Sequence, residues 1–75
     1  MELDAGKCAM EHLGKAINIT GDGWAVRGVL VEVRHFLGRD NKVPSTQVRV
    51  VVNAGGTTQL LDLTLRDLDK VQIED

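Results

Sequence analysis

Alternation of apolar and polar residues is the main pattern along this chain, and it predicts strands over most of its length. Five segments carry this period-two pattern, at residues 17–20, 24–36, 46–53, 57–65 and 71–73. The connections between them are typical of turns and loops. Residues 21–23 and 54–56 are rich in glycine, and residues 38–45 form a polar stretch that holds the only proline. The pattern therefore predicts a mainly β chain whose strands follow one another in hairpins.

Helical spacing is confined to the N-terminal segment, where we expect one short α-helix over residues 4–13. Met10 and Leu13 lie three positions apart on one predicted stripe, and Gly14 follows as a natural left-handed stop. Asp4 precedes them as a helix N-cap. Residues 66–70 are too few for an α-helix and predict a single 3₁₀ turn before the last strand.

The second predicted strand breaks its own alternation at Gly28. Its large apolar residues fall at even positions before this glycine and at odd positions after it. They are Trp24, Val26, Val29, Val31 and Val33. A regular strand cannot bury both sets on one face, so we expect a bulge or sharp bend at Gly28 that lets one long strand serve two sheets.

These elements predict a single small domain of 75 residues, with the helix at 4–13 and a five-stranded β-barrel at 16–74. Closure into a barrel would leave no strand edge exposed. A domain this small buries only about 60% of the surface of its unfolded chain, so its core is marginal. Association with another subunit is one way in which such domains gain stability.

The segments "LGKAINIT", "GVLVEV" and "LTLRDLDKVQI" resemble parts of the Sm-like small barrels, which belong to the wider SH3-like superfold. The resemblance implies binding rather than catalysis, and assembly into rings or dimers. Sm-type proteins carry an aspartate and an asparagine after their second strand and an arginine–glycine pair near the end. Here these places hold His35-Phe36-Leu37 and Arg66-Asp67. The resemblance therefore implies the fold without the uridine-binding activity.

Composition and charge change this picture in a few respects. The net charge of −2 argues against a dedicated nucleic-acid binder, and an aromatic content of 3% leaves few platforms for base stacking. No apolar run is long enough to span a membrane. Cys8 is the only cysteine, which excludes an internal disulfide and, with no export signal, predicts a cytoplasmic protein.

Candidate chemistry is sparse, and we expect no catalytic site, no cofactor and no metal. Cys8 and His12 are spaced four apart, but a structural zinc site needs about four ligands. A packed thiol is the more common role of a cysteine on an apolar face.

Two surfaces remain as candidate binding sites. The first is a modest basic face on the second and third strands and their joining loop, suited to RNA, DNA or another anion. It comprises Arg27, Arg34, Arg39, Lys42 and Arg49. The alternative, which we favour, is that these charges form ordinary cross-strand ion pairs, with Glu32 opposite Arg49.

The second surface is a set of apolar residues left on the outward parity after one core face is assigned. It comprises Leu30, Phe36, Leu37, Val43, Val51 and Leu60. A cluster of this kind is typical of an interface between copies, although the N-terminal helix could cover part of it.

The sequence thus favours a non-enzymatic small-barrel interaction or assembly module that forms homo-oligomers and binds a protein partner. The first alternative is an RNA- or DNA-binding barrel that uses the basic face. The second is an enzyme whose site is shared between subunits.

Overall fold

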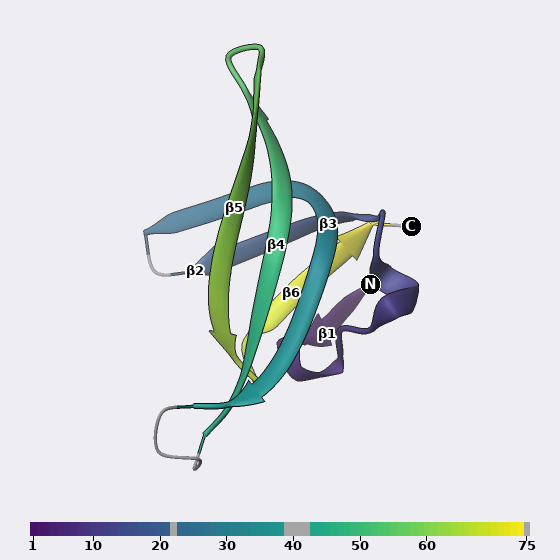
Figure 1. Cartoon of the computed structure of the whole chain (residues 1–75), viewed down its shortest axis with the longest axis vertical. Coiled ribbons are helices and arrows are strands. Elements are labelled where there is room, and N and C mark those ends of the chain that lie inside the picture. The colour runs from purple at the N-terminus through teal and green to yellow at the C-terminus, as the bar shows by residue number, and fades with distance from the viewer. Residues whose placement is uncertain (22, 39–42, 75) are drawn as a thin grey trace.

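The computed structural model describes residues 1–21, 23–38 and 43–74, and it is mainly β (Figure 1). Its elements, in chain order, are β1 (Glu2–Asp4), the 3₁₀ turns η1 (Ala5–Lys7) and η2 (Met10–His12), β2 (Ala16–Gly21), β3 (Trp24–Leu37), β4 (Pro44–Ala54), β5 (Thr57–Arg66) and β6 (Lys70–Glu74). The five strands expected from the alternation are thereby confirmed, with one short strand added in front of them. No helix in the described ranges is long and apolar enough to cross a membrane.

All six strands belong to one antiparallel sheet with the order β1-β6-β2-β3-β4-β5. β1 and β5 are its two edges, and the sheet is not closed. The expectation of a closed five-stranded barrel is therefore wrong in strand number and in closure. Closure fails because β5 pairs with β4 alone among the described strands and makes no ladder with β1.

β3 joins two layers that pack against each other. Its first half pairs with β2, from Trp24 opposite Gly21 to Val29 opposite Ala16, and its second half pairs with β4. Figure 1 shows β3 curving between them, so that the β4–β5 hairpin crosses in front of β2 and β6. A single long strand serving two layers is the arrangement that the broken alternation predicts.

The core lies between these layers and is built from the inner positions of β2 to β6 and from two residues of the N-terminal segment. Its buried apolar residues are Ala5, Cys8, Ile17, Ile19, Leu30, Val48, Val50, Leu65, Val71 and Ile73. Val48 and Val50 on β4, with Leu61, Leu63 and Leu65 on β5, take the faces that alternation assigns to them.

The change of parity in β3 occurs at Val31, three residues after the predicted position. Leu30 lies opposite Val50, and the next pair is Glu32 opposite Arg49, so Val31 is the extra residue of a β-bulge. The prediction that Val29 and Val31 face the core is wrong, because each is 40% exposed. Leu30 is fully buried, so the prediction that it faces outward is also wrong.

Gly28 has a different role from the one expected, because the backbone of β4 passes very close to it. A Cβ atom at this position would lie 2.3 Å from the carbonyl oxygen of Val51. Glycine at this position therefore permits the close approach of β3 and β4. The bulge at Val31, and not Gly28, changes which residues of β3 face the core.

The predicted helix at residues 4–13 is wrong, because the first amides of this segment bond to the β5–β6 turn and the bonds within it are of the i to i+3 kind, as from Cys8 to Ala5. The amides of Ala5 and Gly6 donate to the carbonyls of Asp69 and Asp67, at 2.7 and 2.9 Å. Asp4 makes no side-chain cap and pairs with Lys70 of β6. The segment thus forms a short edge strand and two isolated 3₁₀ turns.

A hydrogen-bonded turn, rather than a 3₁₀ helix, connects β5 to β6. The amide of Asp69 donates to the carbonyl of Arg66 at 3.1 Å, which is the i to i+3 bond expected here. The Asp69 carboxylate in turn accepts the Arg66 amide at 2.9 Å. The carbonyl groups of this turn accept the amides of Ala5 and Gly6, so the turn holds the N-terminal segment in place.

Candidate association surface

The outer face of the β3–β4–β5 layer carries a row of apolar side chains that crosses all three strands. Val29 lies opposite Val51, and Val51 lies opposite Leu60. Directly opposed residues in antiparallel strands share a face, so these three side chains are neighbours. Val29 is 40% exposed, Val51 is half-buried and Leu60 is 60% exposed. We call these three residues the outer apolar row.

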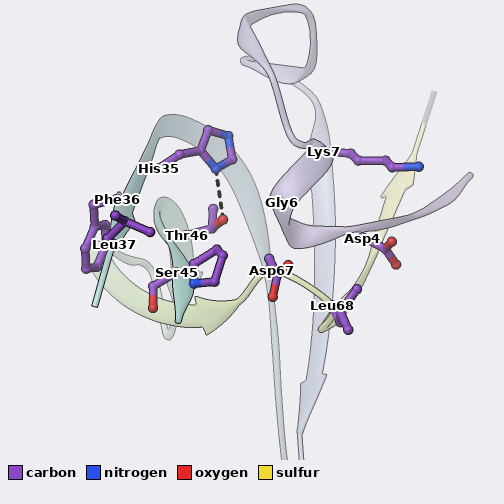
Figure 2. Close-up of a pocket in the computed structure, with 11 residues that line it drawn as sticks. Asp4, Gly6, Lys7, His35, Phe36, Leu37, Ser45, Thr46, Asp67 and Leu68 are labelled. Carbon is purple, nitrogen blue, oxygen red and sulfur yellow. Dashed lines mark hydrogen bonds between the residues drawn. The ribbon is translucent and has the colours of Figure 1, made fainter. Parts of the chain in front are cut away.

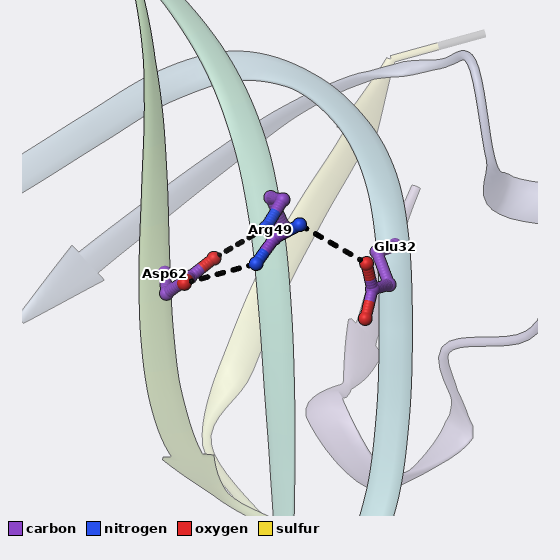
Figure 3. Close-up of polar contacts among 3 residues, drawn as sticks. All are labelled: Glu32, Arg49 and Asp62. Carbon is purple, nitrogen blue, oxygen red and sulfur yellow. Dashed lines mark hydrogen bonds and ion pairs between the residues drawn. The ribbon is translucent and has the colours of Figure 1, made fainter.

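Figure 3 shows a row of charged residues, Glu32, Arg49 and Asp62. The strand register places this row next to the outer apolar row, on the same face. The Nε of Arg49 donates to Asp62 at 2.7 Å, and one of its terminal nitrogens lies 3.4 Å from a carboxylate oxygen of Glu32. The hydrogen bond from Arg49 holds the pKa of Asp62 below its ordinary value, and the same bond raises the pKa of Arg49. The predicted pair of Glu32 and Arg49 is confirmed.

Three of the predicted basic residues, Arg27, Arg34 and Arg49, lie in the part of the chain that the structure describes. Arg27 pairs with Glu74 at 2.8 Å, and Arg49 lies between two carboxylates. Arg34 lies over the ring of Phe36, with its guanidinium carbon 5.1 Å from the ring centroid. Arg39 and Lys42 lie outside the described residues. Two of the three arginines that can be placed are thus engaged with carboxylates of this chain.

The predicted apolar surface divides into two parts. Val51 and Leu60 belong to the outer apolar row, whereas Leu37 and Val43 are exposed at the far end of the β3–β4 pair. Phe36 is half-buried beneath Arg34. The N-terminal segment packs elsewhere, where Met10, Leu13 and Val33 help to line a cavity of about 220 Å³. It therefore leaves the outer apolar row uncovered.

Sequence reasoning missed Val29, because it counted this residue among the core positions. Even parity runs unbroken through Val26, Gly28 and Leu30, which are all inner positions of β3. If these three even positions are assigned to the core face, Val29 falls on the outer face of β3.

A pocket of about 530 Å³ lies between η1, the end of β3, the start of β4 and the β5–β6 turn (Figure 2). His35 is one of the polar residues that line it. Its Nε2 donates to the Cys8 carbonyl at 2.7 Å, and its Nδ1 lies 2.9 Å from the Thr46 hydroxyl oxygen. Both ring nitrogens thus bond within the chain, and the imidazole ties the N-terminal segment to β3 and β4.

Cys8 lies in the core, and its burial raises the pKa of its thiol. His12 is also buried, and its Nδ1 accepts the amide of Ala9 at 2.9 Å. Within the described ranges, no three His, Cys, Asp or Glu side chains gather closely enough to hold a metal ion. Cys8 and His12 are thus both buried side chains of the N-terminal segment.

β5 forms a long free edge beside the outer apolar row. It has ten residues, whereas the other edge strand, β1, has three. Of the described strands, only β4 pairs with β5. Residues 57–60 of β5 are all exposed, so this half of the edge is accessible along its length.

Comparison with models of known protein families, with curated proteins and with solved structures gives no match for this chain.

Proposed function

We propose that this protein is a self-associating interaction module, and that copies meet through the outer apolar row and the edge of β5. The observation that carries the proposal is the alignment of Val29, Val51 and Leu60 across three strands. Isolated exposed apolar residues are ordinary on protein surfaces, but a contiguous row next to an unpaired strand edge is typical of an interaction site.

The size of the domain supports the same proposal. Among the residues that the structure describes, ten form its buried apolar core, most of them valine, leucine and isoleucine. Burying a fully exposed Val or Leu side chain stabilises a structure by about 1.5–3 kcal/mol. Association would extend the apolar contacts that such a small chain can make by itself. The resemblance to Sm-like barrels, which implies ring or dimer assembly, is compatible with this function.

Light scattering after size-exclusion chromatography tests the proposal. We expect the wild-type protein to have the mass of an oligomer at high micromolar concentration. Leu60→Lys places a charge in the outer apolar row and should reduce the mass to that of a monomer. Leu68→Lys is the matched control, because Leu68 is 71% exposed on the β5–β6 turn and lies outside the row.

Circular dichroism of both variants establishes that each is folded before the masses are compared. A wild-type protein that is a monomer at every concentration would refute self-association. Equal loss of mass in both lysine variants would show that the outer apolar row is not the contact surface.

A further inference from the structure

We propose that two copies pair their β5 strands antiparallel, about a two-fold axis that lies midway between the two copies of Leu60. This inference rests on the proposed self-association and adds its geometry and its register. The partner is a second copy of this chain, and the joint sheet would run without interruption through both molecules.

The free edge of β5 supplies the backbone groups for this pairing. An edge strand presents a row of N–H and C=O groups that another strand can satisfy. β5 is the longer edge by far, and its first four residues are all exposed. Pairing identical edges gives a closed dimer, because each copy uses the same surface on both sides of the axis.

Symmetry restricts the possible registers of two β5 strands. Opposed residues in an antiparallel pair lie on the same face of the sheet. A two-fold axis normal to the sheet therefore pairs outer residues with outer residues, and it passes midway between the two copies of one residue. An axis at an inner residue, Leu61 or Leu63, would set Leu60 against the partner's Asp62 or the partner's Arg66, so an axis at an outer residue is favoured. The outer residues of β5 include Leu60, Asp62 and Thr64, since these oppose Val51, Arg49 and Gln47 of β4.

The side chains of β5 then favour the axis at Leu60. An axis at Asp62 would place this carboxylate against the partner's Asp62, and directly opposed like charges destabilise a sheet. An axis at Thr64 would set Asp62 against the partner's Arg66, but Asp62 already bonds Arg49, and β5 ends at Arg66. That register would pair only residues 62–66 and would leave Leu60 unburied.

An axis at Leu60 pairs residues 57–63 of one copy with the same residues of the other. Leu60 then lies against the partner's Leu60, and Asp62 lies opposite the partner's Thr58. The two outer apolar rows become continuous across the dimer, from Val29 of one copy to Val29 of the other. The pairing therefore buries the most exposed residue of the row at its centre.

Disulfide trapping tests the register directly. Cβ atoms of opposed residues lie about 4.5–5.5 Å apart, close to the spacing that a disulfide bridges. In a Cys8→Ala background, we expect Leu60→Cys to form a covalent dimer on mild oxidation. Thr64→Cys, on the same face of β5, is the matched control and should stay uncrosslinked.

A mixing experiment tests the off-axis contacts. The register places Thr58 opposite the partner's Asp62, so an equimolar mixture of Thr58→Cys and Asp62→Cys proteins should form mixed disulfides in preference to either homodimer. Masses of all reduced variants, measured by light scattering, establish which of them still associate.

Each other outcome overturns the inference in a distinguishable way. Efficient trapping of Thr64→Cys without trapping of Leu60→Cys would place the axis at Thr64. Reduced variants that are dimeric but that never crosslink through β5 would show that another surface is used, with self-association intact. A monomeric wild-type protein would remove the proposed function together with this inference.

Discussion

Cys8 shows at the scale of one residue how the N-terminal segment is bound into the fold. Its thiol is buried in the core, and its carbonyl oxygen accepts a hydrogen bond from His35 Nε2 at 2.7 Å. Side chain and backbone of this residue thus face two different environments, one apolar and one polar. Burial of the thiol disfavours the thiolate, which is why its pKa is raised.

The raised pKa of Cys8 predicts a loss of stability at alkaline pH. The unfolded chain releases the thiol proton at a lower pH than the folded chain, so the stabilisation is complete below the ordinary thiol pKa. It declines as the pH rises from there through the higher pKa of the folded state. We expect the urea-unfolding free energy of the wild-type protein to fall more steeply between about pH 8 and 10 than that of Cys8→Ala.

The Cys8→Ala comparison separates the thiol from other groups that titrate in this range. Lys70, whose pKa is raised by its bond to Asp4, is unchanged in the variant. Parallel pH profiles for the two proteins would contradict a buried thiol.

Single residue pairs could be predicted from the sequence where alternation alone decides them. Glu32 and Arg49 were expected as a cross-strand pair, and they lie opposite each other at 3.4 Å. Leu30 could not be placed in this way. Whether Leu30 faces the core depends on whether it precedes or follows the β-bulge. The sequence indicated a bulge at Gly28, before Leu30, whereas the bulge lies at Val31, after it.

At the scale of the element, β3 is shaped by two neighbouring irregularities with different causes. Gly28 permits close approach of the β4 backbone, and Val31 is the bulged residue that exchanges the faces. Together they allow Val26 and Leu30 of the first half, and Val33 of the second half, to pack against one core.

Gly28→Ala should therefore destabilise the protein, although alanine is a small residue. Its Cβ would overlap the Val51 carbonyl oxygen, which belongs to the backbone and cannot turn away. We expect a loss of about 1–3 kcal/mol in the free energy of unfolding, which is typical of overpacking. Chemical denaturation monitored by Trp24 fluorescence measures it.

Gly38→Ala is the control for this substitution. A Cβ there would meet its nearest neighbour, the Val43 carbonyl oxygen, at 3.2 Å, so the loss should be smaller. Equal losses at the two positions would show that close contact at Gly28 is not the cause.

Strands of this chain could be predicted from the sequence, and the N-terminal segment could not. Alternation in β4 and β5 reports burial directly, because one face of each strand packs on the core. The helical spacing of Met10 and Leu13 has no such partner, since Met10 is 84% exposed. Backbone bonds from Ala5 and Gly6 to the distant β5–β6 turn decide the local structure, and no local pattern reveals them.

At the scale of the whole molecule, an open sheet leaves two edges of very different length. The β4–β5 hairpin ends in a two-residue turn, Gly55-Gly56, in which both residues have positive φ, at 59° and 81°. Such a turn matches the twist of the strands that it joins. The hairpin presents the exposed first residues of β5, among them Leu60, where a second copy can reach them.

The thermal unfolding midpoint should therefore depend on protein concentration. Association stabilises only the folded chain, so a self-associating domain of this size should gain roughly 3–6 °C for each tenfold increase in concentration. Leu60→Lys should show a constant midpoint. Scanning calorimetry over a hundredfold range measures this, and a constant wild-type midpoint would contradict association of the folded state.

The candidate site could be predicted from the sequence in part. Val51 and Leu60 were recognised because β4 and β5 are apolar on both faces at these positions. Alignment with Val29 was hidden, because it depends on the register between β3 and β4 beyond the bulge. The open edge of β5 was also hidden, since closure of a sheet depends on how its strands coil in space.

The bulge at Val31 has a consequence for which changes in chain length the fold can accept. Inserting or deleting one residue between Glu32 and Leu37 would exchange the two faces of that half of β3, sending Val33 outward and Arg34 into the core. Adding two residues at Gly55-Gly56 would only extend a hairpin tip that is already exposed. Variation in length should therefore concentrate at that tip and avoid the second half of β3.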